Sequence, residues 1–301
     1  MSHVSQKTFL QYCFHLWVMS VFISAHILPL PFLLIFEKTL PQKLRHQFWR
    51  RAARITNGIV FKLAGIHVII PKNLPDPTQR PCVFVSNHPS MVDGFIYFSF
   101  LGPEIIPLSA PADTLMFPFN IWFPKMGIVD VKRDYFDERM SKSANTKKIA
   151  LQKLVTLLTK KNKSVLIFPE GHIEPLKKLH YLHTGAARVA ISAHAPVVPL
   201  ALINMDLIMV DRIHEKPGRI YVRWHPPLVP PTVSAHLPYK KAVKEFSKTI
   251  TEVVQSMIPS RNIPFDILDP HPERIGVFID IDRTLYNGYS QKDFIKYLMK
   301  K

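Results

Sequence analysis

The hydrophobic pattern begins with a long apolar run and continues as short apolar segments separated by amphipathic ones. Residues 9–36 contain no Asp, Glu, Lys or Arg, and about 20 apolar residues are enough to cross a bilayer. Two histidines and the Pro29/Pro31 pair interrupt the run. The pattern favours a membrane-embedded hairpin or one tilted span. The alternative is a buried core helix.

A basic amphipathic segment follows this run. Apolar residues recur there at spacings of three and four, which places them on one helix face: Leu40, Leu44, Phe48, Ala52, Ile55, Ile59 and Leu63. No acidic residue occurs between Glu37 and Asp76, although Lys and Arg recur. A basic amphipathic helix beside an apolar anchor is typical of membrane-surface binding. The alternatives are a basic face packed on a core and a nucleic-acid-binding arm.

Short β-branched runs then alternate with helical patterns. Strands are predicted at 82–86, before Arg133 within 125–134, and at 164–168, 195–203 and 219–224. Helices are predicted from Pro89 to about 101, and over 141–160, 184–194 and 240–257. The proline-rich stretch 102–124 is predicted to be a loop region without regular secondary structure. Its exposed part would face a membrane or bind an acyl chain. The alternation predicts an α/β fold with a mixed central sheet flanked by helices, preceded by a membrane-associated N-terminal helical region.

Composition narrows the class of partner. The net charge is +17, with 39 Lys and Arg against 22 Asp and Glu. Such a bias suggests partners that carry phosphates, namely nucleic acid, anionic lipid or phosphorylated substrates. The two cysteines, Cys13 and Cys82, exclude a disulfide framework and a zinc knuckle, which fits a reducing compartment.

The candidate chemistry lies in Asn87-His-Pro-Ser-Met-Val-Asp93, directly after the first of these strands. Residues five apart on one helix point about 140° away from each other. With Pro89 at the start of the helix, however, His88 stays outside it and Asp93 can reach back. A neutral imidazole can take a proton from a hydroxyl, and a carboxylate on its other nitrogen fixes the tautomer. The spacing alone is weak evidence for such a pair.

Four blocks resemble those of the glycerolphosphate acyltransferase family, which includes lysophosphatidate acyltransferases. Asn87–Asp93 is similar to its NHx4D block, and Gly127–Arg133 to its second block, a Gly and an Arg six apart. Phe168–Gly171 matches the third block, Phe-Pro-Glu-Gly, and Val197–Pro199 is similar to the fourth. The blocks lie in order, and the resemblance covers about Ile66 to Trp224.

The resemblance implies acyl transfer from an acyl thioester, on coenzyme A or acyl carrier protein, to a hydroxyl of a lysophospholipid. The acceptor would be 1-acylglycerol-3-phosphate, and neither a metal nor a further cofactor is expected. His88 would be the general base and Asp93 its orienting partner. Arg133 would bind the acceptor's phosphate, a surface ion pair being the alternative. The partners implied are membrane lipid and the acyl carrier, without nucleic acid, at the cytoplasmic face of a membrane.

The remaining site residues implied by the resemblance would shape the acceptor pocket: Asn87, Phe168, Pro169, Glu170 and Gly171, with Gly127 as a weaker candidate. A turn-stabilising carboxylate is the alternative for Glu170. The family often has Thr or Ser and then Arg after Phe-Pro-Glu-Gly, and a Lys before the next Thr-Gly. His172 and Ile173 follow here, and His183 replaces the Lys. His172 and His183 are thus weaker candidates for phosphate contacts, and the reaction type is better defined than the acceptor.

A second motif stands near the C-terminus. Asp280-Ile-Asp282-Arg-Thr284 resembles the first motif of haloacid dehalogenase-like phosphatases, with Asp280 as nucleophile and Asp282 as acid/base. The family's other motifs would need roughly 100–200 further residues. We therefore expect an inactive, truncated start, unless the motif is a chance match.

Four parts of the chain are expected. They are a membrane-associated segment over 1–39, an acyltransferase domain over 40–257, a linker over 258–272 and the phosphatase-like start over 273–301. Two other functions compete with acyl transfer. One is a Mg²⁺-dependent phosphatase that uses Asp280 and Asp282. The other is a basic membrane- or nucleic-acid-binding module without catalysis.

Overall fold

The computed structural model describes most of the chain up to residue 259. The ranges described are 9–74, 80–131, 140–171, 182–210, 213–214 and 216–259. All of them lie in the first of two compact units, Met1–Ile263 and Pro264–Lys301. Nearly all of the predicted linker and the whole phosphatase-like start fall outside the described ranges, so those domain boundaries stay predictions.

A mixed sheet of seven strands forms the centre of this unit, in the order β1-β9-β6-β2-β5-β3-β4. The strands are β1 (Ile66–Ile69), β2 (Val83–Ser86), β3 (Ile105–Ser109), β4 (Val129–Asp130), β5 (Ser164–Ile167), β6 (Val197–Ile203) and β9 (Gly218–Trp224). Neighbours are parallel except β6 and β9, which are antiparallel. Every residue of β2, β5 and β6 is buried, as expected for parallel strands covered on both faces. The predicted mixed sheet flanked by helices is confirmed.

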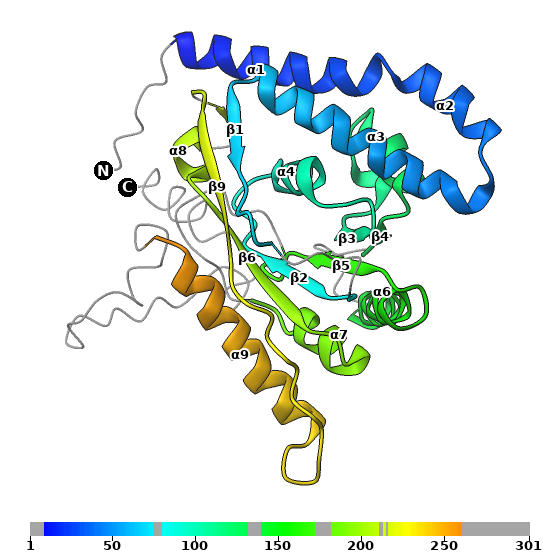
Figure 1. Ribbon diagram of the computed structural model, residues 1–301, viewed down its shortest axis with the longest axis vertical. Helices are drawn as coiled ribbons and strands as arrows, with labels where there is room; N and C mark the ends of the chain where they lie inside the picture. The colour runs from blue at the N-terminus through cyan, green and yellow to red at the C-terminus, as the bar shows by residue number, and fades with distance from the viewer. Residues whose placement is uncertain are drawn as a thin grey trace, which may run out of the picture. The chain divides into compact units, whose positions relative to one another are not determined.

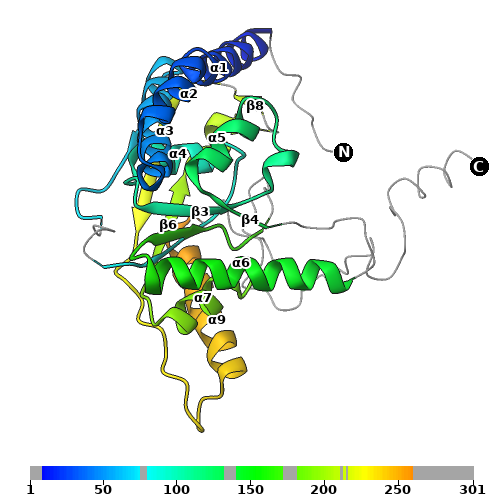
Figure 2. The ribbon, with the colours of Figure 1, turned by 90° about the vertical axis from the view of Figure 1, so that its right-hand side faces the viewer.

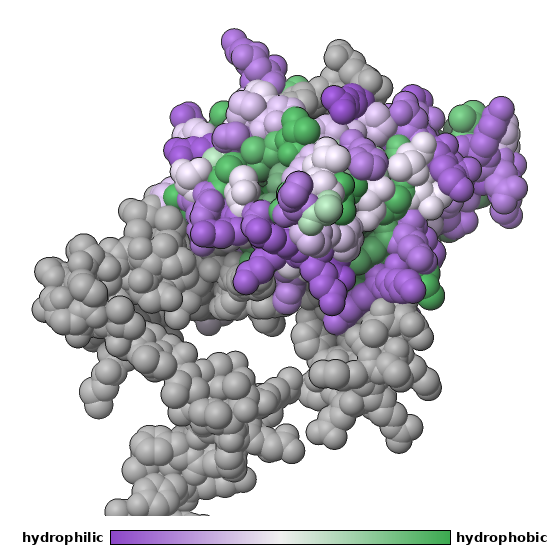
Figure 3. Space-filling model, turned by 90° about the horizontal axis from the view of Figure 1, so that it is seen from below, coloured by the Kyte–Doolittle hydropathy of each residue, from purple (hydrophilic) through white to green (hydrophobic). Residues whose placement is uncertain are grey.

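One face of the sheet is covered by helices that the sequence predicts well. They are α6 (Met140–Lys160), α7 (Gly185–Ala193) and α9 (Tyr239–Met257), and they form the lower layer in Figure 2. Val83, Val85 and Val165 point from the sheet into this layer, because alternate residues of a strand face opposite sides. Figure 3, a view from below, shows hydrophilic residues over much of the described surface there, with hydrophobic residues in a band between them.

The opposite face is covered by α3 (Gln42–Leu63), α4 (Asp93–Phe100) and α5 (Phe119–Met126), with a short helix α8 (Met205–Ile208) beside them. Phe84, Leu166 and Val198 point from the sheet into this second core. Two further helices, α1 (Phe9–Ile27) and α2 (Leu30–Thr39), lie over α3 at the top of Figure 1. A hairpin of β7 (Met209–Val210) and β8 (Ile213–His214) contacts α1.

The N-terminal helices are apolar on their outer side. Phe9–Thr39 is the single helical stretch in the described ranges that is long and apolar enough to cross a membrane, and 22% of an apolar window of 18 residues within it is buried. The break at Leu28–Pro29 separates α1 from α2. Only every fourth position of α1 turns fully inward: Val18, Phe22 and His26. So exposed a helix does not fit the alternative of a buried core helix, whereas the hairpin and the tilted span both stay predictions.

Helix α3 has two apolar faces, of which periodicity alone predicted one. Part of the predicted face is on the surface, with Ile55 65% and Ile59 50% exposed, whereas Phe48 and Ala52 pack against the core. The buried face carries Trp49, Ala53 and Val60, together with other residues that the apolar spacing did not select. Helix α3 therefore packs on the core mainly through its other face. Membrane-surface binding and the alternative of a basic face on a core-packed helix both stay predictions.

Two local predictions are also wrong. The stretch 102–124 is not irregular, since it contains β3, a 3₁₀ turn over Ala112–Thr114 and most of α5. Its prolines suggested a loop, but the buried Phe119 and Trp122 anchor α5 against the N-terminal helices. Helix α4 begins at Asp93 instead of Pro89, which leaves the whole segment between them as a loop.

Candidate active site

The candidate site lies where two adjacent parallel strands end. Val85 of β2 is paired with Ile167 of β5, so the residues that follow these strands emerge at one edge of the sheet. His88 comes two residues after β2, and Phe168 directly follows β5. Ligands of open α/β sheets bind at this carboxyl edge, and the first and third sequence blocks meet there.

His88 and Asp93 are in contact, as the sequence predicts. Nδ1 of His88 lies 3.0 Å from Oδ2 of Asp93. The Asp93 side chain is fully buried, whereas that of His88 is 18% exposed. Burial raises the pKa of the Asp93 carboxyl above its ordinary value, and the hydrogen bond to His88 opposes this rise. With Nδ1 turned to Asp93, Nε2 is the nitrogen left for a substrate.

The loop between the two residues holds the carboxylate in place. The backbone N–H of Ser90 donates to Oδ2 of Asp93 at 2.7 Å. The hydroxyl of Ser90 donates to Sδ of Met209, which belongs to β7. Ser90 was not among the predicted site residues, although its place two residues after His88 was the available signal. Met209 had no such signal, because 119 residues separate it from Ser90.

Asn87 is fixed to a third strand by both ends of its side-chain amide. Its Nδ2 donates to the carbonyl of Leu202 at 3.1 Å, and the N–H of Leu202 donates to its Oδ1 at 2.8 Å. Next to it, the Ser86 hydroxyl is hydrogen-bonded to the Tyr97 hydroxyl. Burial raises the pKa of Tyr97. These bonds tie the start of the loop to β6 and α4.

The third block holds His88 in two ways. The backbone N–H of His88 donates to Oε1 of Glu170 at 2.6 Å, and the Glu170 side chain is buried. The ring of Phe168 is stacked on the His88 ring, with centroids 4.3 Å apart and planes 19° apart. Gly171 closes the turn with a φ of +81°, a backbone conformation that favours glycine.

Comparison with known proteins identifies the fold and the family of this site. A family model described as "Acyltransferase" matches residues 65–203, which include His88, Asp93 and the Phe168–Gly171 turn. Residues 65–203 belong to the acyltransferase family. The matched region contains all four sequence blocks. The first and third meet at the site, and the fourth, Val197–Pro199, lies in β6.

Two curated relatives of the acyltransferase domain have the same enzyme name. The 1-acyl-sn-glycerol-3-phosphate acyltransferase of Limnanthes alba is 27% identical over 58% of this chain and 59% of that protein. The protein of the same name from Pseudomonas aeruginosa is 31% identical over 54% of this chain and 60% of its own length. The chain thus spans about three fifths of the length of these relatives.

A solved structure shows the same fold. The 1-acyl-sn-glycerophosphate acyltransferase PlsC of Thermotoga maritima superimposes with a TM-score of 0.63, covering 82% of this chain and 95% of that one. Sequence identity is 16%, so the likeness concerns the arrangement of helices and strands. The match therefore shows that most of the chain shares the fold of that protein.

Other predicted site residues of the acyltransferase domain have different surroundings. Gly127 ends α5 with a φ of +68°, and a Cβ there would lie 2.9 Å from the His46 ring. Packing and backbone conformation therefore require glycine at this position. His183 is exposed, and its N–H donates to the carbonyl of Pro169 at 2.7 Å, so it adjoins the third block.

Several predicted residues lie outside the described ranges. They are Arg133, His172, Asp280, Asp282 and Thr284. Their roles stay predictions. In the part of the chain that the structure describes, no group of three or more His, Cys, Asp or Glu side chains is placed to hold a metal ion.

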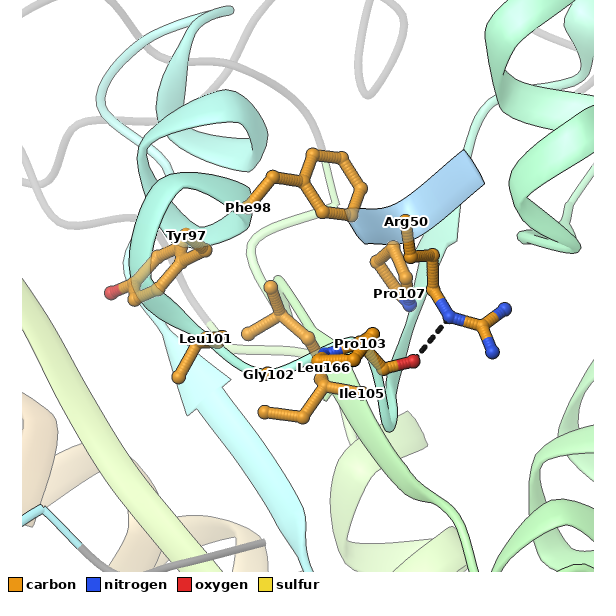
Figure 4. Close-up of a pocket in the computed structure, with 9 residues that line it drawn as sticks. All are labelled: Arg50, Tyr97, Phe98, Leu101, Gly102, Pro103, Ile105, Pro107 and Leu166. Carbon is orange, nitrogen blue, oxygen red and sulfur yellow. Dashed lines mark hydrogen bonds between the residues drawn. The ribbon is translucent and has the colours of Figure 1, made fainter. Parts of the chain in front are cut away.

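A small recess lies behind the site, between α4 and the sheet. It holds about 280 Å³ of empty space, counting the part open to solvent, and Figure 4 shows its lining of mostly apolar residues. Tyr97 forms one wall, and its ring also lies 5.8 Å from that of Phe168. Arg50 lines the other side, and two bonds hold its guanidinium to the carbonyls of Pro103 and Met126. Burial lowers the pKa of Arg50 to about 10.

Proposed function

We propose that the chain transfers a fatty acyl group from an acyl thioester to the free hydroxyl of 1-acylglycerol-3-phosphate. The donor carrier is coenzyme A or acyl carrier protein. The contact between His88 Nδ1 and Asp93 Oδ2, 3.0 Å long, carries the proposal because it lies inside an acyltransferase-family domain. The names of the curated relatives support the choice of acceptor.

The proposed reaction begins with proton transfer to His88. Nε2 takes the proton of the acceptor hydroxyl while the oxygen forms a bond to the thioester carbonyl carbon. The tetrahedral intermediate then collapses, the carbon–sulfur bond breaks, and the imidazolium returns the proton to the leaving thiolate. The products are the diacylated phospholipid precursor and the free thiol, so the histidine ends as it began.

Asp93 and the buried loop serve this cycle by holding one tautomer. A carboxylate on Nδ1 keeps the proton there, leaves Nε2 unprotonated, and stabilises the imidazolium that forms. Glu170 holds the backbone of His88 in place. Because these groups are already in position, little free energy of reorganisation is needed when the substrates bind.

The acceptor's phosphate is assigned to cationic groups that follow strands of the same sheet in the sequence. Arg133 is the leading candidate, since a guanidinium matches phosphate oxygens. It lies downstream of β4, the strand next to β3. His183 and His172 are further candidates. Replacing each of the three by Ala should raise the KM for lysophosphatidate with a smaller change in kcat.

Membrane association is proposed through the outer side of α1, α2 and α3. Exposed apolar side chains gather there, among them Leu16, Leu28, Phe32, Ile55 and Ile59. Exposed Arg51, Arg54 and Lys62 lie on the same α3, and each cation near anionic lipid contributes about 1 kcal/mol. This basic character favours the cytoplasmic face of the membrane.

The decisive experiment measures thiol release from an acyl thioester by the purified protein in lipid vesicles. The acceptors are lysophosphatidate, other lysophospholipids and glycerol phosphate, each with a coenzyme A donor and a carrier-protein donor. His88→Ala should reduce turnover by about 10²–10⁴-fold, and Asp93→Asn by a comparable factor. His67→Ala, which changes an exposed histidine of β1, is the matched control. Turnover near the wild-type value in His88→Ala would refute the mechanism.

The rival functions make different predictions in the same assay. The family match ends at residue 203 and does not reach Asp280, so a phosphatase activity has no support from it. Such an activity would release phosphate with Mg²⁺ and would be lost in Asp280→Asn. A binding module without catalysis would bind vesicles equally well before and after His88→Ala, with no thiol release from either protein.

A further inference from the structure

The third sequence block contacts His88 through its aromatic residue as well as through its carboxylate. Phe168 continues β5, whose last residues pair with the last residues of β2. This places the Phe168 ring against the imidazole, with centroids 4.3 Å apart and planes 19° apart. Near-parallel rings at this separation are a favourable offset stack.

The other side of Phe168 is held by the core. Its ring centroid lies 5.8 Å from that of Tyr97, which is 0% exposed. The Tyr97 hydroxyl is hydrogen-bonded to Ser86 at the end of β2. Phe168 is therefore in a tilted contact with a fixed core residue and is stacked on an imidazole that is only partly buried.

We propose that Phe168 is a positioning residue for the catalytic base and does not primarily bind the acceptor. The inference rests on the proposed function, in which His88 is the base. The hydrogen bond to Asp93 fixes one edge of the imidazole but leaves rotation about that bond. A flat ring 4.3 Å away removes this rotation and fixes the direction in which Nε2 points.

The same ring acts on the charge that develops during the reaction. When Nε2 takes the hydroxyl proton, the imidazole becomes a cation lying over an aromatic face. A cation over an aromatic ring within about 6 Å is stabilised by the ring quadrupole. The Asp93 carboxylate stabilises the cation from its edge, and Phe168 stabilises it from its face. Both contributions are larger in the transition state than in the ground state, so they raise kcat.

The two roles of Phe168 predict different kinetics. A residue that binds the acceptor affects the KM for the acceptor, whereas a residue that positions the base affects kcat. We expect kcat to fall about tenfold in Phe168→Leu and in Phe168→Met, with the acceptor's KM within about threefold of wild type. Methionine nearly conserves the volume but lacks the flat ring.

A third variant, Phe168→Tyr, tests whether another aromatic residue at this position preserves kcat. Phe168 is partly exposed, so the additional hydroxyl of Phe168→Tyr can reach water. This variant should keep kcat within about threefold of wild type, since the aromatic face is retained. Phe100→Leu is the matched control, because Phe100 is also half-buried and packs on Tyr97 with centroids 5.5 Å apart. It should leave kcat unchanged.

The outcomes separate the positioning role from the proposed function. If His88→Ala removes turnover but Phe168→Leu and Phe168→Met keep the wild-type kcat, the positioning role is wrong and the acyltransferase mechanism stands. An effect on KM alone also overturns the positioning role, as does an equal loss in Phe168→Tyr. If His88→Ala retains turnover, both proposals fail. Unfolding midpoints of all variants, compared with that of Phe100→Leu, show how much loss comes from stability.

Discussion

The two helical layers that enclose the sheet are built in opposite ways. Helix α9 buries an apolar stripe of Val243, Phe246 and Ile250 and exposes charged residues. The N-terminal layer of α1 to α3 exposes apolar residues and buries polar ones, including His26, Arg50 and Asn57. On the α9 side, Ser247 is the one buried polar residue among those side chains of α6, α7 and α9 whose burial the structure describes.

The difference is the one expected if the N-terminal layer contacts lipid, as proposed above. A helix that faces water needs one apolar stripe, as in α9. A layer that also contacts lipid can place apolar residues on both sides, and polar groups inside it then bond to protein. Arg50 does so through two carbonyls, and Trp122 donates to the carbonyl of His26 at 3.0 Å. These bonds join α5 to α3 and to α1, and they add to the apolar packing of Trp49 against Trp122.

The largest expected effect is loss of vesicle binding when the outer apolar face becomes charged. The triple variant Leu16→Glu, Leu28→Glu and Phe32→Glu replaces side chains that are 64%, 72% and 74% exposed. Each such side chain contributes about 1.5–3 kcal/mol when buried in lipid, so partitioning should fall about 10³-fold or more. Co-sedimentation with anionic vesicles measures it.

A matched change on the other layer provides the control for this triple variant. Gln152→Glu, Thr156→Glu and Thr249→Glu add the same charge at exposed positions of α6 and α9. We expect vesicle binding to change by less than about threefold, through long-range charge repulsion alone. Equal losses in the two triple variants would show that the layers do not differ in what they contact.

The second largest effect concerns folding stability. Phe246→Ala empties a core position of α9 that is 6% exposed, and should lower the free energy of unfolding by about 3–5 kcal/mol. Phe32→Ala, at a 74% exposed position of α2, should change it by less than about 0.5 kcal/mol in detergent-free solution. Chemical denaturation of both variants measures the contrast, and similar losses would mean that α2 is packed against protein.

A smaller effect follows from a buried histidine beneath α1. Burial, together with the nearby His15, lowers the pKa of His214 from 6.5 to about 4. Between pH 6.5 and about 4, His214 is protonated in the unfolded chain but neutral in the folded chain. The free energy of unfolding therefore decreases as the pH falls through this range. His214→Leu should remove up to about 3 kcal/mol of this acid-dependent loss.

Unfolding midpoints measured at several pH values test the His214 prediction. The informative quantity is the difference in slope between the wild type and His214→Leu, and not the absolute stability of either protein. His67→Leu, at an exposed position of β1, controls for the loss of a histidine. Parallel slopes for all three proteins would mean that His214 is not protonated on unfolding in this range.

The smallest effect is expected on the charged side of α9. Nζ of Lys248 lies 3.7 Å from Oε1 of Glu252, and the two side chains are 78% and 60% exposed. Lys248→Ala should lower the free energy of unfolding by about 0.3–0.5 kcal/mol at low salt, and by less at high salt. A loss above 1 kcal/mol, roughly twice the usual value for such pairs, would show that this side of α9 is not freely solvated.

The difference between the two helical layers also explains which elements could be predicted from the sequence. Helix α9 was predictable from one apolar periodicity, and the strands β2, β5 and β6 from short continuous apolar runs. The contact of His88 with Asp93 was also predictable, because Pro89 had to keep His88 out of the helix. In the structure the loop is longer than expected, and α4 starts at Asp93 itself, but the contact is the same.

Elements with two sets of contacts could not be predicted from one pattern. The buried face of α3 depends on carbonyls that lie 53 and 76 residues from Arg50. Helix α5 contains Pro124 and follows Pro118, so local preference argued against it and packing decided for it. In the site, the bonds of Asn87 to Leu202 and of Ser90 to Met209 join distant segments, and no spacing along the chain indicates them.

The pairing of β2 with β5 has a consequence for how the protein tolerates insertions and deletions. Val85 opposite Ile167 sets the positions of His88, Phe168 and Glu170 together. A single residue inserted into either strand would turn every following side chain to the opposite face, and so separate the base from both of its supports at once. Length changes in these two strands should therefore abolish activity in one step.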